Sequence, residues 1–171
     1  MSMKKTLSHI LSSILITLIL SSTTLISGEK TSLQWKNFND GIAQAKKTNK
    51  KILLDVYTDW CGWCKKMDEE VYTNKDIASY LADRYIVVKL DAESESKLNY
   101  DDKTMSEMQL AQGFGVTGYP TTIFMKANGD AITLVAGYIP AETFIEVITF
   151  IGEDHYKKMK WEEYVSKKKG Q

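Results

Sequence analysis

Two cysteines three residues apart, Cys61 and Cys64, are the residues whose type and spacing point most directly to chemistry. They are the only cysteines in the 171-residue chain, and the segment that holds them is DWCGWCKK. A pair with this spacing is able to form a redox couple, to supply half of a metal site, or to serve as a small structural disulfide. The remainder of the sequence bears on all three interpretations.

Zinc binding is disfavoured by a shortage of further ligands. A structural zinc site needs four ligands. The only histidines in the sequence are His9, near the N-terminus, and His155, in the C-terminal tail. We therefore expect no metal. A purely structural disulfide is also disfavoured, because closing so short a loop removes little entropy from the unfolded chain. The redox couple remains the favoured interpretation.

The first 28 residues differ in character from the rest of the chain. Lys4 and Lys5 precede an apolar run from Ile10 to Leu20, and a polar stretch follows before the first acidic residue, Glu29. This order is typical of a secretory signal peptide. Serines and a threonine interrupt the apolar run, which is shorter than the roughly 20 residues that span a bilayer.

We therefore predict that residues 1–28 are cleaved, near Ser27 or Gly28, and that the protein is exported, to a periplasm. The alternative is an uncleaved N-terminal segment that tethers the protein to a membrane. Export would expose the dithiol to oxidising conditions, under which disulfides form and persist.

Residues 29–171 are expected to fold as a single domain with a C-terminal helical tail. Their number supports one well-buried core and is too small for two ordinary domains. The chain carries 22 basic and 22 acidic residues, and the basic residues are spread along its length. This distribution gives no electrostatic footprint for nucleic acid. We expect a monomer that binds no nucleic acid.

Two apolar runs around the cysteines predict buried strands, over residues 51–58 and 85–92. A helix from Cys61 to about Thr73 and a short helix over residues 76–85 lie between them. Such a strand–helix–strand unit implies parallel strands joined by a right-handed crossover.

The predicted helix places both cysteines at its N-terminus. There Cys61 faces unpaired backbone N–H groups and the positive end of the helix dipole, which stabilise a thiolate and lower its pKa. Cys64 lies one turn later, within reach of a disulfide. We predict that Cys61 is the nucleophile and Cys64 the resolving thiol.

The rest of the chain predicts further helices, one loop and one hairpin. In chain order they are an amphipathic helix over residues 35–49, a surface loop over residues 93–103, a helix opened by a capping box from Thr104 to Glu107 and ending at Gly113 or Gly115, a hairpin around Asn128-Gly129, a helix beginning at Pro140, and a terminal helix that packs Tyr156, Trp161 and Tyr164 on the domain.

In their order, these segments resemble the thioredoxin family. The stretches that carry the resemblance are ILLDVYTDWCGWCKKM, VVKLDA, GVTGYPTTIFM and NGDAITLVAGYIP, which together span about residues 35 to 152. The resemblance implies an α/β thioredoxin fold, a central mixed β-sheet flanked by helices. It also implies a thiol–disulfide oxidoreductase with no cofactor other than the Cys61–Cys64 disulfide.

Two features depart from the family pattern. Gly62-Trp63 stands where typical thioredoxin has Gly-Pro, and the segment from Asp91 to Gly118 is longer than in a minimal thioredoxin.

The resemblance also implies roles for two charged residues on the predicted strands. Asp55, if buried, would have a raised pKa and would exchange a proton with Cys64; the alternative is a solvated carboxylate at the end of a strand. Lys89 is the corresponding partner for Asp55, with a surface lysine as the alternative.

The remaining implied site residues would contact substrate. Pro120 is expected to be cis, with the backbone of Tyr119 pairing with the substrate chain as an added strand. Trp60 is expected to pack and shape the rim of the site. Trp63, beside Gly62, is expected to be exposed and to contact partners.

The function expected from the sequence is an exported reductase of disulfides in proteins. Its electrons would come from another protein, such as one in the membrane. Two alternatives remain: a thioredoxin-like disulfide donor or isomerase, and a redox-silent adaptor or chaperone with the same fold.

Overall fold

The computed structural model describes residues 32–170, so the predicted signal peptide, residues 1–28, lies outside the described residues. The elements, in chain order, are α2 (Phe38–Thr48), β1 (Lys51–Tyr57), α3 (Gly62–Glu70), α4 (Lys75–Arg84), β2 (Tyr85–Asp91), β3 (Lys97–Tyr100), β4 (Lys103–Ser106), α5 (Glu107–Gly113), β5 (Thr121–Met125), β6 (Ala131–Ala136), α6 (Ala141–Gly152), a 3₁₀ helix η1 (His155–Lys157) and α7 (Trp161–Lys169).

The main sheet has the strand order β2-β1-β5-β6. β1 and β2 are parallel, as the predicted strand–helix–strand unit requires, whereas β5 is antiparallel to both β1 and β6. A single residue before α2, Lys36, extends the sheet by pairing with Val88 of β2. The predicted α/β fold with a mixed central sheet is confirmed.

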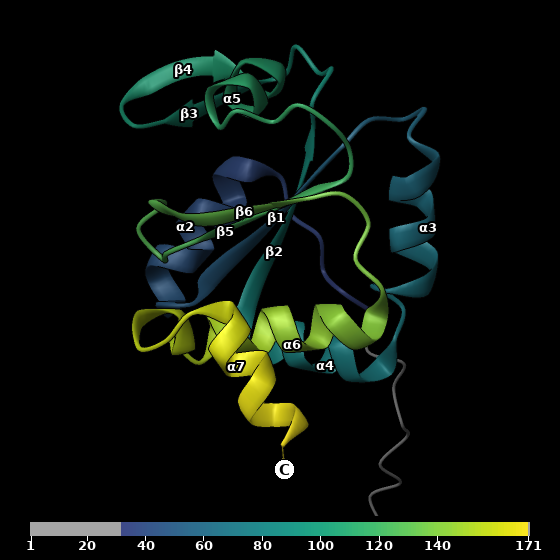
Figure 1. Ribbon diagram of the computed structural model, residues 1–171. Coiled ribbons are helices and arrows are strands. Elements are labelled where there is room, and N and C mark those ends of the chain that lie inside the picture. Colours follow the sequence, from purple (N-terminus) through teal and green to yellow (C-terminus); the bar gives the residue numbers. More distant parts are fainter. Residues whose placement is uncertain (1–31, 171) are drawn as a thin grey trace, which may run out of the picture.

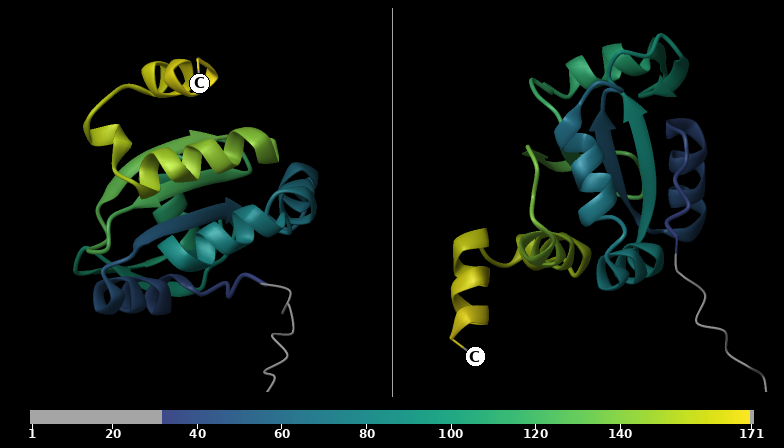
Figure 2. Two further views of the ribbon diagram at one scale, coloured as in Figure 1. Left: turned by 90° about the horizontal axis from the view of Figure 1, so that it is seen from below. Right: turned by 90° about the vertical axis from the view of Figure 1, so that its right-hand side faces the viewer.

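The two faces of the sheet carry separate hydrophobic clusters. Because side chains alternate along a strand, Leu53 of β1 faces one cluster, while Leu54 and Val56 face the other. Helices α3, α4, α6 and α7 contribute to the first cluster, and α2, α5 and the β3–β4 hairpin to the second. Figure 1 shows the helices around the sheet, and the right-hand view in Figure 2 places α2 on the opposite side of the sheet from α3 and α6.

The segment predicted as a surface loop, residues 93–103, instead contains β3 and the start of β4, which form an antiparallel hairpin. Its two-residue turn is Asp101-Asp102, and both residues have positive φ, 52° and 59°. Aspartate tolerates this left-handed conformation, so the turn forms without the glycine that usually marks such hairpins. Leu98 anchors β3 in the second cluster, where it is 3% exposed.

The helix that follows is capped two residues later than predicted. Thr104 lies in β4, paired with Asn99, and the capping box runs from Ser106 to Gln109. Two capping-box patterns overlap in this segment, Thr104–Glu107 and Ser106–Gln109. Because strand pairing keeps Thr104 extended, the helix begins after Ser106. The helix ends at Gly113, as predicted.

The first described helix also begins later than predicted. Its N-cap is Asn37, whose side chain accepts a hydrogen bond from the backbone of Asp40. Trp35 therefore lies before the helix and packs edge-on against Tyr72, with ring centroids 4.9 Å apart. The strand pairing of Lys36 keeps this segment extended until Asn37.

The C-terminal part agrees with the sequence prediction except that Tyr156, expected in the terminal helix, lies in η1 before α7 begins at Trp161. Pro140 is the N-cap of α6, and α7 packs Tyr164, which is 5% exposed, on the domain. In residues 32–170 there is no helix with the length and apolar character needed to cross a bilayer.

Candidate active site

Cys61 and Cys64 form a disulfide at the N-terminus of α3, directly after β1 and its following loop. Cys61 is the N-cap of the helix, and the backbone N–H of Cys64 donates a hydrogen bond to Cys61 Sγ, at a distance of 3.1 Å between N and S. In the reduced protein the same amide and the helix dipole would stabilise a thiolate on Cys61.

Both sulfur-bearing side chains are largely covered in the disulfide form. Cys61 and Cys64 are each 4% exposed, whereas the intervening Gly62 is exposed. Apart from its chain neighbours and the backbone of its own helix, no atom lies within 4 Å of the position that a Cβ on Gly62 would occupy. The open surface over Gly62 therefore lies immediately beside the disulfide.

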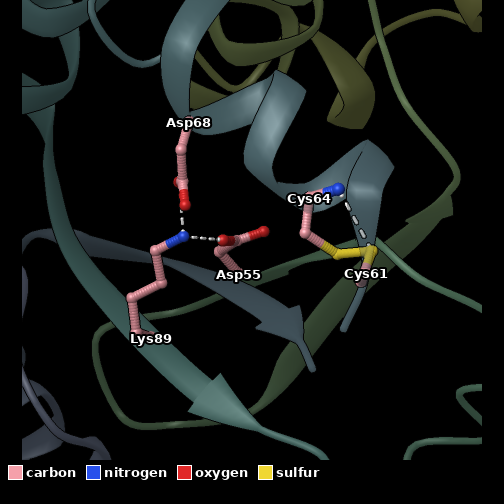
Figure 3. A network of polar contacts seen from close by, with 5 residues as sticks. All are labelled: Asp55, Cys61, Cys64, Asp68 and Lys89. Atoms are coloured by element: carbon pink, nitrogen blue, oxygen red, sulfur yellow. Dashed lines mark hydrogen bonds and ion pairs between the residues drawn. A yellow bond between two sulfur atoms is a disulfide. The ribbon is translucent and has the colours of Figure 1, made fainter. Parts of the chain in front are cut away.

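Asp55 lies beneath the disulfide, near the middle of β1. It shares its face of the sheet with Leu53, because the two are separated by one strand period. Its side chain is 2% exposed, and Figure 3 shows it between Lys89 and the disulfide. Burial raises the pKa of the Asp55 carboxyl, although Lys89 opposes this shift.

Lys89 joins the buried Asp55 to a second carboxylate, Asp68. Its Nζ lies 2.5 Å from Asp55 Oδ2 and 2.5 Å from Asp68 Oδ1 (Figure 3). Burial alone would lower the pKa of Lys89, but the two carboxylates outweigh it and raise the pKa above its usual range. Aromatic rings of Trp35, Tyr57 and Tyr72 surround the same ammonium. Lys89 is thus a partner of Asp55 and not a free surface lysine.

The Tyr119–Pro120 peptide bond is cis, as the resemblance implied. Pro120 is buried and its carbonyl accepts a hydrogen bond from the backbone of Gly137, at 2.8 Å between N and O. Gly137 has a φ of 88°, which favours glycine at this position. The loop before β5 and the loop after β6 are therefore fixed to each other.

The two tryptophans beside Cys61 are both exposed. Trp63 is 57% exposed, as expected, but Trp60 is 66% exposed, and the expectation that it is a packed residue is corrected. The Trp60 indole N–H donates to Glu93 Oε1 at 2.9 Å, and its ring meets Tyr119 edge-on. This hydrogen bond to a surface carboxylate holds Trp60 away from the core.

A comparison with family models identifies a thioredoxin-like domain over residues 38–152. The chain belongs to the thioredoxin-like family. In this chain the cysteine pair lies at a helix N-terminus near a buried acid, and the peptide bond before Pro120 is cis.

Curated members of this family that resemble the chain are disulfide-exchange proteins. The chain is 32% identical over 108 residues to the thiol:disulfide interchange protein DsbD of Ralstonia nicotianae, covering 63% of this chain and 16% of that protein. It is 24% identical over 101 residues to the disulfide bond reductase DsbH of Chlamydia pneumoniae, covering 58% of this chain and 60% of that protein. The similarity to DsbD thus spans a small part of that protein.

Solved thioredoxin-fold structures agree with the architecture. A thioredoxin-fold protein from Helicobacter pylori superimposes with a TM-score of 0.58 at 25% identity, covering 71% of this chain and 80% of that one.

Sequence reasoning missed two carboxylates at the site, Asp68 and Glu93. Asp68 lies one helical turn after Cys64, so its spacing could have placed it on the same face of α3. Glu93 contacts Trp60 across 33 residues of sequence, and no local pattern indicates that contact. In the described part of the chain, no group of three or more His, Cys, Asp or Glu side chains is arranged to hold a metal ion.

Proposed function

We propose that this protein is exported and reduces disulfide bonds in other proteins through its Cys61–Cys64 pair. The observation that carries the proposal is the placement of this pair at the N-cap of α3, above the buried carboxyl of Asp55. Thiol–disulfide exchange needs a thiolate that attacks the disulfide, a second thiol that resolves the mixed disulfide, and a proton acceptor.

In the first step the Cys61 thiolate attacks one sulfur of a substrate disulfide. A bond forms between Cys61 Sγ and that sulfur, the substrate S–S bond breaks, and the other substrate sulfur leaves as a thiolate that takes a proton from solvent. The amide of Cys64 stabilises the charge on Cys61 before the attack.

In the second step Cys64 resolves the mixed disulfide. Its thiol gives a proton to the Asp55 carboxylate, and its sulfur attacks Cys61 Sγ. The bond between Cys61 and the substrate breaks, and the second substrate thiolate leaves and is protonated. The substrate has gained two electrons, and this protein is oxidised to the Cys61–Cys64 disulfide.

The charge of Asp55 supports electron flow from this protein to its substrates. A dithiol becomes a strong oxidant when its reduced, thiolate form is strongly stabilised. An ionised Asp55 beneath the sulfurs would oppose such a thiolate, which favours reduction of substrates by this protein. The similarity to a protein named disulfide bond reductase supports the same direction.

Export and the source of electrons complete the proposal. Export rests on the order of charged, apolar and polar residues in the first 28 residues. Regeneration of the dithiol requires two electrons, which a dithiol of a second protein would supply by the same exchange chemistry.

The test is reduction of a protein disulfide, such as those of insulin, by the purified protein with dithiothreitol as the regenerating reductant. We expect reduction well above the rate of dithiothreitol alone, and loss of that increase in Cys61→Ser. Fractionation of the producing cells should place a shortened chain outside the cytoplasm.

Two results would contradict the proposal. A wild-type protein that gives no increase over dithiothreitol would remove the reductase function. Binding of client proteins that persists in Cys61→Ala, without any exchange by the wild type, would point to the adaptor.

A further inference from the structure

Two pairs of aromatic rings flank the dithiol, and each is hydrogen-bonded to a glutamate. In the first pair, Trp60 packs against Tyr119, with ring centroids 6.0 Å apart, and donates its indole N–H to Glu93. We call these three residues the Trp60 flank. The matching group is built on Trp63, which lies between the two cysteines in the sequence.

In the second pair, Trp63 packs against Tyr138 at 5.4 Å between ring centroids, and the Tyr138 hydroxyl donates to Glu70 Oε2 at 2.7 Å. Lys66 completes this group, because its Nζ lies 5.1 Å from the centre of the Trp63 ring and 3.9 Å from Glu70 Oε1. We call these four residues the Trp63 flank.

The two flanks differ in charge. In the Trp63 flank, the lysine balances the glutamate and occupies the aromatic faces. In the Trp60 flank, Glu93 has no ion-pair partner within residues 32–170, and neither has Asp59, the residue directly before Trp60. The Trp60 flank therefore presents an exposed tryptophan beside uncompensated negative charge.

The position of the Trp60 flank places it along the path of a substrate. Trp60 directly precedes Cys61, and Tyr119 directly precedes the cis-proline Pro120. A substrate chain that pairs with the backbone of Tyr119 while its cysteine reacts with Cys61 must pass beside Trp60. Its side chains next to the cysteine then come within reach of Glu93.

We propose that the Trp60 flank binds an arginine or lysine side chain next to the reactive cysteine of the substrate. The inference rests on the proposed function and adds a substrate class to it: protein disulfides in which a basic residue lies next to the reactive cysteine. The Trp60 ring offers its face to the cation, and Glu93 offers its charge. The hydrogen bond from Trp60 fixes the carboxylate at the edge of that ring.

The expected preference is moderate, because the site is exposed to solvent. A cation–π contact and an exposed ion pair together favour a basic over an acidic neighbour by about three- to tenfold in kcat/KM. Salt screens such interactions, so the preference should shrink at high ionic strength.

The test uses three peptides that differ only in the residues flanking a single cysteine, which are arginine, alanine or glutamate. Each cysteine is held in a disulfide with a chromogenic aryl thiol, whose release reports the reaction. Each rate is divided by the rate of the same peptide with dithiothreitol, which removes differences in intrinsic reactivity. The quantity compared is the ratio of kcat/KM for the arginine and glutamate peptides.

The decisive variant is Glu93→Gln. Its side-chain carbonyl still accepts the hydrogen bond from Trp60, but the charge is gone, so the ratio should fall by about two- to threefold while the contribution of the Trp60 ring remains. The matched control is Asp101→Asn, which removes one negative charge from the β3–β4 turn. This turn shares a surface with the Asn128-Gly129 turn, which follows the end of β5 that is farther from Pro120. Asparagine also tolerates the left-handed backbone there. We expect the control to keep the wild-type ratio.

Two results would overturn the inference. Equal rates for the three peptides, or the same fall in ratio for Glu93→Gln and Asp101→Asn, would remove this recognition while leaving the proposed function standing. A wild-type protein that reduces none of the peptides would overturn the proposed function and this inference together.

Discussion

The residues beneath the dithiol and the residues around it are arranged in opposite ways. Asp55 is 1% exposed and is held by a lysine that also binds a second carboxylate, whereas Trp60 and Trp63 are 66% and 57% exposed. The buried group has one fixed environment, and the exposed rings are free to meet a partner. Under the proposed mechanism, proton transfer and partner selection therefore depend on different residues, and variants of each region should change different kinetic constants.

The largest effect is expected from Cys64→Ser, which removes the resolving thiol but leaves both regions in place. Turnover should fall by at least about a hundredfold, as for other covalent catalytic groups. A mixed disulfide between Cys61 and the substrate should accumulate at one per protein chain, as measured by mass spectrometry. Normal turnover without this species would contradict the assigned roles of the two cysteines.

Asp55→Asn separates proton transfer from binding. If Asp55 accepts the proton from Cys64, resolution of a preformed mixed disulfide should slow by about a hundredfold near neutral pH. The measurement is single-turnover release of substrate across a pH series, with KM determined in parallel. A rise in KM with an unchanged rate of resolution would break the proposed separation.

The same substitution should change how stability depends on pH. Because burial raises the pKa of Asp55, the folded chain binds more protons than the unfolded chain between the ordinary pKa of 3.8 and the higher pKa of the folded state. The free energy of unfolding should therefore fall as pH rises through this window, by about 1.4 kcal/mol for each pH unit that the window spans.

Urea unfolding of the wild type and Asp55→Asn over this pH range measures that slope. The variant should lose the part of the decrease that Asp55 causes. An identical pH dependence in both proteins would show that Asp55 titrates normally in the folded chain.

The smallest effect is expected from the exposed region. Trp63→Ala should raise KM for protein substrates by about three- to tenfold, the loss typical of one moderate contact in an interface. The rate of resolution, measured in single turnover, should change far less than in Asp55→Asn. A Trp63→Ala variant that slows resolution as much as Asp55→Asn does would erase the distinction between the two regions.

The buried region was the more predictable part of the site from sequence. The apolar runs around Asp55 and Lys89 predicted two parallel strands, whereas the partnership of these two residues was implied by the family resemblance. In the structure the parallel register places Asp55 opposite Lys89. The helix predicted to begin at Cys61 was also found, with Cys61 as the N-cap of α3. The two strands and the start of α3 were predictable because the periodicity of apolar residues is visible in the local sequence.

The exposed region was less predictable, because long-range side-chain contacts decide it. The exposure of Trp60 depends on Glu93, which lies at the start of the segment predicted as a loop. That segment forms a hairpin whose strands are only four residues long and whose Asp101-Asp102 turn lacks glycine. Strand pairing of Thr104, a tertiary contact, likewise decides that α5 is capped by Ser106 and not by Thr104.

The most direct test of the account is the reduction potential of the Cys61–Cys64 pair in the purified protein. It is measured by equilibration in dithiothreitol or glutathione buffers, with thiol labelling as the readout. The account predicts a reversible two-electron couple near the thioredoxin value of about −270 mV. A value near about −120 mV, typical of a disulfide donor, or the absence of a reversible couple would contradict it.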